Sequence, residues 1–219
     1  MLWLALACTS SPPVDSGPLR GGVQLAFPLI ERELFDTPIG MDHDPDEYSG
    51  AEALICTAYD GRPFPACYDG HEGTDFLLDG GFEQMDGGSA TILAAAAGTV
   101  VEVEDGHYDR CNGTLDAGND CDGEEMISNT VIIQHEDGWR SLYLHMMRGA
   151  MKVEVGDSVD CGTPLGLVGS SGNSSTPHLH LGLEDPSGQS IDPYAGEYSQ
   201  PETYWLEQGD PEGLPGGCP

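Results

Sequence analysis

The chain has 219 residues, and its 38 acidic side chains against 7 basic ones give a formal net charge of −31 at pH 7. Nucleic-acid binding and docking on anionic lipid both need basic surfaces, so this charge argues against either partner. The length suits one compact domain with tails, and 31 glycines with 16 prolines predict many turns and few long helices. We interpret the acidity as a solubilising coat, with a cationic partner as the alternative.

The N-terminal segment reads as a leader followed by a tether. Residues 1–8 form an apolar run that ends in small residues and Cys8, a pattern that resembles the end of a bacterial lipoprotein signal. Lipidated Cys8 would then attach the protein to a membrane. Residues 9–28 are rich in Ser, Pro and Gly and predict a disordered linker, so that 1–28 precede an acidic extension over 29–66. The sequence contains no stretch of about 20 apolar residues, so it predicts no membrane-spanning helix.

Six further cysteines predict three disulfides, because an even number suits an oxidising compartment. Sequence proximity suggests Cys56–Cys67 and Cys111–Cys121, which leaves Cys161–Cys218, although six cysteines allow fifteen connectivities. None of the spacings is Cys-x2-Cys, so we discount a structural zinc cluster.

Residues 71–75 read His-x-Gly-x-Asp and form the first candidate metal-binding segment. On an extended strand His71 and Asp75 would share a face, and Gly73 gives the backbone room to approach an ion. Neutral imidazole and carboxylate are typical zinc ligands. His43, His107 and His135 lack such a partner, and we expect them to lie in exposed loops or turns.

The middle of the chain predicts short strands. Residues 90–104 contain an alanine run, but Gly98 and the alternation of Val101 and Val103 with glutamates favour strand–turn–strand. Further strands are expected in 130–139 (ending in a turn at 136–138), 140–146, 153–159 and 164–169. This spacing predicts an all-β fold, a compact antiparallel sheet domain of sandwich or barrel type with long loops.

The acidic loop at 111–125 has carboxylates and Asn/Gly spacing that suit Ca²⁺, which takes 6–8 oxygen ligands. The loop lacks the residue order of an EF-hand. A surface insertion closed by a disulfide is therefore the preferred interpretation, and calcium is the alternative.

His178 and His180 are separated by one apolar residue, so on a strand both point to one face while Leu179 and Leu181 point into a core. Catalytic zinc sites use three protein ligands and keep a fourth position for water. His71, Asp75 and one histidine of this pair supply three ligands. The other histidine and His145 then have no structural duty.

Together these motifs resemble the lysostaphin-type (LytM-like) zinc metallopeptidases, which cut peptide bonds in bacterial cell walls. The resemblance rests on His-x-Gly-x-Asp at 71–75, on 95–103, on Tyr-Leu-His at 143–145, on 155–162 and on the 172–180 segment that ends in His-Leu-His. It implies a compact antiparallel β-fold with the site in an open groove. Thr176 stands where the family usually has glycine, and Leu181-Gly182 where it tends to Phe-Glu, which affects substrate preference more than catalysis.

The resemblance also assigns roles to five residues. It implies that His71, Asp75 and His180 ligate zinc, and that His145 and His178 flank the zinc-bound water. One of these two histidines then acts as general base and the other as hydrogen-bond donor to the oxyanion, and the sequence does not show which has which role.

The sequence thus predicts a zinc endopeptidase domain over 67–195, with a C-terminal strap over 196–219. Its expected substrates are cross-links or stem peptides of peptidoglycan, in the bacterial cell envelope or outside the cell. Two alternatives stay open: a non-catalytic wall-binding or regulatory protein of the same fold, and a secreted protease acting on general proteins.

Overall fold

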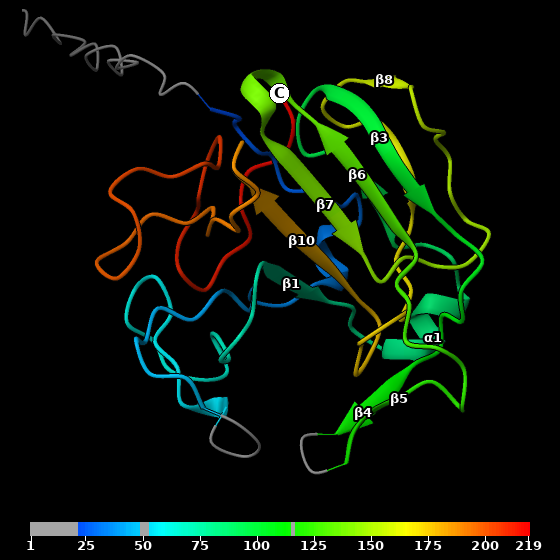
Figure 1. Cartoon of the computed structure of the whole chain (residues 1–219), viewed down its shortest axis with the longest axis horizontal. Coiled ribbons are helices and arrows are strands. Elements are labelled where there is room, and N and C mark those ends of the chain that lie inside the picture. Colours follow the sequence, from blue (N-terminus) through cyan, green and yellow to red (C-terminus); the bar gives the residue numbers. More distant parts are fainter. Residues whose placement is uncertain (1–21, 49–52, 115–116) are drawn as a thin grey trace, which may run out of the picture.

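The computed structural model describes residues 22–48, 53–114 and 117–219. Its main element is a six-stranded antiparallel sheet with the strand order β1-β10-β7-β6-β3-β8 (Figure 1). The strands are β1 (Thr74–Leu77), β3 (Gly98–Glu104), β6 (Thr130–Gln134), β7 (Arg140–Leu144), β8 (Ser158–Val159) and β10 (His178–Glu184). The predicted all-β antiparallel fold is confirmed.

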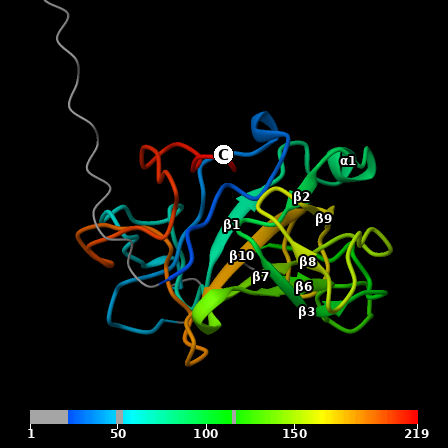
Figure 2. The same cartoon turned by 90° about the horizontal axis from the view of Figure 1, so that it is seen from above.

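Smaller elements pack around this sheet. β2 (Thr91–Leu93) pairs with β9 (Pro164–Leu167), and β4 (Asn112–Thr114) pairs with β5 (Gly118–Asp120). The helical pieces are α1 (Gly81–Asp86) and the 3-10 turns η1 (Arg32–Leu34) and η3 (Glu136–Gly138). Figure 2 shows β2, β9 and α1 on one side of the large sheet. Over the described residues, no helix has the length and apolar character needed to cross a membrane.

The core follows from the two-residue period of the strands. Leu179, Leu181 and Leu183 of β10 are all buried on one face, and a fully buried leucine stabilises the fold by about 1.5–3 kcal/mol. His178 and His180 alternate with them and therefore project from the opposite face. One strand thus packs the core and carries the histidine pair, as predicted.

The predicted strands lie close to their expected places. The alanine run is strand–turn–strand, with β2 before it and β3 after it, and the 136–138 turn joins β6 to β7. The expected strand over 153–159 is shorter, since only Ser158–Val159 pairs with β3.

The predicted linker over 9–28 extends too far. Leu25 and Phe27 are almost completely buried, and Phe27 packs edge-on against Phe76 at 5.2 Å between ring centroids. Trp205, from the predicted C-terminal strap, pairs with Leu25 and also lies in the core. The core therefore draws on chain segments from both sides of the predicted domain. Residues 1–21, including the predicted lipidation site Cys8, lie outside the described residues.

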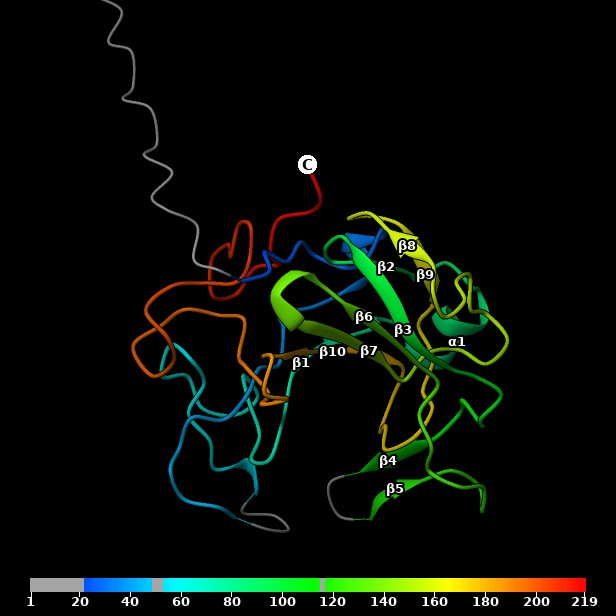
Figure 3. The same cartoon turned by 45° about the horizontal axis from the view of Figure 1, so that its top comes forward.

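All three predicted disulfides are present: Cys56–Cys67, Cys111–Cys121 and Cys161–Cys218. The first two close short loops, which lie at the same end of the sheet in Figure 3, below β1 and around β4–β5. The third fixes the C-terminal end beside Gly162.

Candidate metal centre

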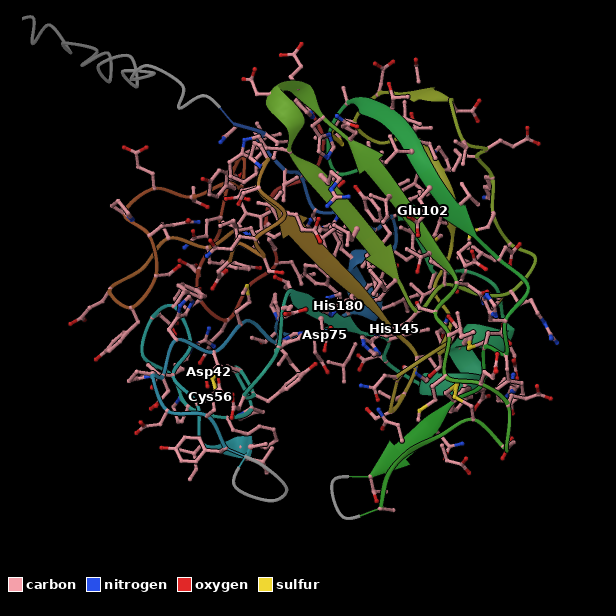
Figure 4. The ribbon with its side chains drawn as sticks, in the orientation of Figure 1. Asp42, Cys56, Asp75, Glu102, His145 and His180 are labelled. Carbon is pink, nitrogen blue, oxygen red and sulfur yellow. A yellow bond between two sulfur atoms is a disulfide. The ribbon has the colours of Figure 1, made fainter. Side chains whose placement is uncertain are left out.

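The pairing of β1 with β10 brings the two halves of the site together. Asp75 lies directly opposite His180, and Leu77 lies opposite His178. Because directly paired residues share a face of the sheet, the carboxylate and both imidazoles project from the same side. Figure 4 shows Asp75, His145 and His180 close together at this end of the sheet.

His71 reaches the site from a loop, not from the extended strand that its spacing predicts, since β1 begins only at Thr74. Its Nδ1 lies 2.8 Å from the carbonyl oxygen of Gly40. A carbonyl can only accept, so Nδ1 carries the proton and the Nε2 lone pair of the neutral ring faces the site. A distant loop thereby fixes the orientation of this imidazole.

Three ligand atoms converge on one point. The Nε2 of His71 lies 3.1 Å from both the Oδ1 of Asp75 and the Nδ1 of His180, and those two atoms are 2.9 Å apart. Ligands at about 2.0–2.1 Å from a tetrahedral zinc ion lie about 3.3 Å from one another, close to this spacing. A cation between the three would satisfy lone pairs that otherwise face each other, so the donor set fits zinc.

Gly73 is needed for this approach. A Cβ atom at this position would lie 2.5 Å from Nε2 of His180 and 2.7 Å from the carbonyl oxygen of Leu181. Any side chain at residue 73 would therefore push the His180 ring out of place. The glycine of His-x-Gly-x-Asp has a steric function that the sequence only partly indicated.

His178 and His145 stand beside the three converging atoms. The Nδ1 of His178 donates to the carbonyl of Thr176 at 2.7 Å, and its Nε2 lies 3.5 Å from Oδ1 of Asp75. The Nδ1 of His145 donates to the carbonyl of Ser171 at 2.7 Å. The two rings are 4.6 Å apart, and each presents only Nε2 towards the site.

His145 adopts an unusual backbone conformation, with φ of 62° in the left-handed region. This region is uncommon for residues other than glycine, and such strain concentrates at functional sites. The backbone N–H of His145 donates to the hydroxyl of Ser128 at 2.8 Å, and the next N–H, of Met146, donates to the carbonyl of Asn129 at 3.0 Å. These contacts hold the turn that directs the imidazole into the site.

The buried charges shift one another. Burial raises the pKa of Asp75, but the adjacent His71 and His178 outweigh this effect and hold it well below its usual value. For His71 and His178, attraction to Asp75 outweighs burial and raises both pKa values. Burial, followed by repulsion from His178 and His180, lowers the pKa of His145 to about 3. His145 is therefore neutral at pH 7.

Tyr68 is a site residue that the sequence analysis missed. Its hydroxyl donates to Oδ2 of Asp75 at 3.1 Å, and its ring stacks on His71 with 4.2 Å between centroids. Burial and the adjacent Asp75 carboxylate raise the pKa of Tyr68, which keeps the hydroxyl protonated. Tyr68 thus orients two of the three converging side chains. Its only signal in the sequence is an aromatic residue three positions before His71.

The other histidines do not join this cluster, but two of them are less exposed than expected. His135 is buried and contacts the carbonyl of Ala97 and the hydroxyl of Ser141, both at 2.8 Å. Half-buried His43 contacts Asp192 at 2.8 Å. Both expectations of exposure are wrong, because tertiary contacts cover these loops. His107 lies in a loop and contacts Glu104.

The predicted calcium loop at 111–125 has no support. Within the part of the chain that the structure describes, His71, Asp75 and His180 are the one group able to hold a metal ion. The loop instead forms the β4–β5 hairpin, which Cys111–Cys121 closes and which bonds to residue 175 through the Gly113 N–H. The preferred interpretation, a closed surface insertion, agrees with this structure.

Comparison with known proteins gives one family and several similar structures. The model of peptidase family M23 matches residues 69–193. The catalytic domain of lysostaphin from Staphylococcus simulans is 26% identical, with 62% of this chain and 84% of that chain covered and a TM-score of 0.39. The catalytic domain of the M23 protein EnpA from Enterococcus faecalis is 26% identical, with coverage of 66% and 92% and a TM-score of 0.39.

A zinc-containing peptidase from Vibrio cholerae is 19% identical, with 77% of this chain covered and a TM-score of 0.43. The matched part of this chain spans only 39% of that peptidase.

Proposed function

The chain belongs to peptidase family M23, whose model matches residues 69–193, and we propose that it is a zinc endopeptidase acting on the peptides of bacterial peptidoglycan. Membership indicates a metal-dependent hydrolase. The observation that carries the proposal is the convergence of one carboxylate and two imidazoles, 2.9–3.1 Å apart. Family members that have lost activity would not need this donor set.

In this proposal His71 (Nε2), Asp75 (Oδ1) and His180 (Nδ1) hold the zinc ion. When bound, zinc would polarise the scissile carbonyl and lower the pKa of water towards about 7. The carbonyl of Gly40 keeps His71 in the correct tautomer, and Tyr68 keeps Asp75 turned so that one oxygen faces the other ligands.

His145 and His178 handle protons beside the metal. His145 is neutral at pH 7, so its Nε2 accepts a proton from the attacking water and later returns it to the leaving amine. The Nδ1–H of His178 donates to the carbonyl of Thr176, and attraction to Asp75 outweighs burial and raises the pKa of this ring, so its doubly protonated form can donate from Nε2 to the developing oxyanion. The proposal thereby assigns different roles to the two histidines.

The compartment follows from the disulfides. Three disulfide bonds suit an oxidising environment, so we place the protein outside the cytoplasm, in the cell envelope or secreted. Attachment to the membrane through lipidated Cys8 remains part of this proposal.

The proposal is tested with zinc-loaded protein on purified peptidoglycan. Zinc content is measured first, and release of soluble muropeptides is then followed for the wild type and for His180→Ala. We expect about one zinc ion per chain and release by the wild type only. Zinc binding without cleavage of any wall preparation would contradict an enzymatic role and favour a wall-binding protein. Cleavage of casein at a rate similar to that of peptidoglycan would instead indicate a general protease.

A further inference from the structure

A cavity of about 610 Å³ lies against the outer edge of β1. Its apolar lining comes from two loops and the edge strand: Pro38, Ile39, Pro63, Phe64, Pro65 and Leu77. Most of this lining precedes residue 69, where the match to the family begins. The cavity is thus built largely by the N-terminal extension of this chain.

The strand register connects this cavity to the site. Ile39 pairs with Asp75 across the edge of the sheet, and Asp75 in turn pairs with His180. Leu77 pairs with His178 in the same way. Paired residues share a face, so Ile39 and Leu77 project on the side that carries the metal centre. Two residues along a strand span about 7 Å, so a peptide cleaved at the metal reaches the cavity within one to three residues.

The wall of the cavity is held rigidly. Cys67 is buried, bonded to Cys56 and paired with Gly40, the residue whose carbonyl binds His71. The backbone N–H of Gly40 also donates to the carbonyl of Ala66 at 2.8 Å. The same loop contacts therefore fix both the zinc ligand His71 and the wall of the cavity.

The charge at the cavity is negative. Asp36 and Glu212 line it and are exposed, and the adjacent Asp36 carboxylate raises the pKa of Asp79. No basic side chain pairs with these three carboxylates in the described ranges 22–48, 53–114 and 117–219. The cation that lines the cavity, Arg62, is already bound to Asp60 at 2.7 Å and to the carbonyl of Pro211.

We propose that this cavity is a specificity subsite for a lysine-type side chain of the peptide substrate, a proposal that rests on the proposed function. The methylene stem would lie along Ile39, Phe64 and Leu77, and the terminal ammonium would reach Asp36 and Glu212. A purely apolar side chain would fill the cavity without neutralising these carboxylates. An acidic side chain would be repelled by them.

The test compares two fluorescein-labelled alanine pentapeptides that carry lysine or norleucine at the centre. Their dissociation constants are measured by fluorescence anisotropy on zinc-loaded protein with the His145→Ala change, which slows cleavage by about 10²–10⁴, and each reading is taken before measurable turnover. Exposed ion pairs contribute little each, so we expect the lysine peptide to bind about 5- to 10-fold more tightly, and less so at high salt. The double variant Asp36→Asn/Glu212→Gln should lose this preference and leave the norleucine peptide unaffected.

Two further variants complete the design. Glu102→Gln/Glu154→Gln removes two exposed charges elsewhere on the molecule and should keep the full preference. Phe64→Ala removes part of the apolar wall and should weaken both peptides equally. Equal binding of the two peptides to the parent protein would overturn the subsite. Peptidoglycan hydrolysis is measured separately with the wild type, so a lysine preference without hydrolysis would reject the proposed function alone.

Discussion

The site is assembled from strand residues and loop residues, and the two groups position their side chains by different means. Asp75, His178 and His180 sit on paired strands, where the register of β1 against β10 places them on one face. His71 and His145 sit in loops, where a hydrogen bond from Nδ1 to a carbonyl fixes each ring. The position of a strand residue is fixed by the backbone pairing of the whole sheet, whereas the position of a loop residue depends on a few contacts of its own.

This difference has a consequence for function. A strand residue can be lost without disturbing its neighbours, because the backbone pairing remains. A loop residue is coupled to its partners, so that changes at Tyr68 or Ser128, which lie outside the reacting group, should affect the site. A substitution at a strand residue should therefore remove only the function of that side chain, whereas a substitution at a partner of a loop residue should also disturb the site.

The largest effect is expected from a strand residue of the proposed ligand set. His180→Ala should remove one of the three converging atoms, so zinc content should fall from about one ion per chain to below about 0.1, and activity should be abolished. Elemental analysis after dialysis and muropeptide release measure the two effects. His107→Ala, a change to a loop histidine outside the cluster, is the control and should keep both. Zinc retained by His180→Ala would remove this residue from the ligand set.

The loop histidine His145 should show the converse behaviour. His145→Ala should keep zinc, because His145 supplies none of the three converging ligand atoms. The variant should lose about 10²–10⁴ in kcat, because proton transfer is lost. Zinc content and kcat are measured on the same preparation. Full activity of this variant would contradict its assigned role, and loss of zinc would make His145 a ligand.

The strand half of the site could be predicted from sequence, because its signal is periodicity. The alternation of His178 and His180 with Leu179 and Leu181 identifies both the faces of a strand and the residues that reach the site. The disulfides followed from proximity because two of them close short loops. The ligand set itself came from a family resemblance, since spacing alone left His178 and His180 equivalent.

The loop half could not be predicted in the same way. Nothing near His71 in the sequence indicates that the carbonyl of Gly40 accepts a hydrogen bond from its Nδ1, since the contact joins residues 31 positions apart. The composition of residues 9–28 suggested a linker, although Val23, Leu25 and Phe27 alternate as strand residues do, and all three are buried. Here glycine and proline content outweighed a short periodic signal. Long-range contacts, which composition does not encode, decided both cases.

A smaller effect tests the coupling of the loop residues. Tyr68→Phe removes the hydroxyl that holds Oδ2 of Asp75 but keeps the ring that stacks on His71. Loss of such outer partners typically costs 10–100-fold in metal affinity or activity, and we expect about 10-fold in zinc affinity by competition with a chelator. Tyr198→Phe removes a hydroxyl from an exposed tyrosine and serves as the matched control. Unchanged affinity in Tyr68→Phe would show that Asp75 is oriented by the strand pairing alone.

His135 shows what the carbonyl contact alone provides, and it gives the smallest predicted effect. Its Nδ1 lies 2.8 Å from the carbonyl of Ala97, like the rings of His71 and His145, but its Nε2 faces the hydroxyl of Ser141. The same local contact therefore makes a structural histidine here and site histidines elsewhere. What the second nitrogen faces decides between the two.

Burial lowers the pKa of His135, although the Ala97 carbonyl partly opposes this effect. Below about pH 6.5 the unfolded chain then binds a proton that the folded chain does not. Lowering the pH through this range therefore lowers the free energy of unfolding, whereas above it His135 has no effect. This contribution is at most about 1.4 kcal/mol per pH unit. Urea unfolding from pH 7.5 to 5 should show a shallower decline for His135→Gln than for the wild type or the control His107→Gln. Equal slopes in all three proteins would mean that the pKa of His135 is the same in the folded and unfolded chain, and that burial of this ring beside a carbonyl does not keep it neutral.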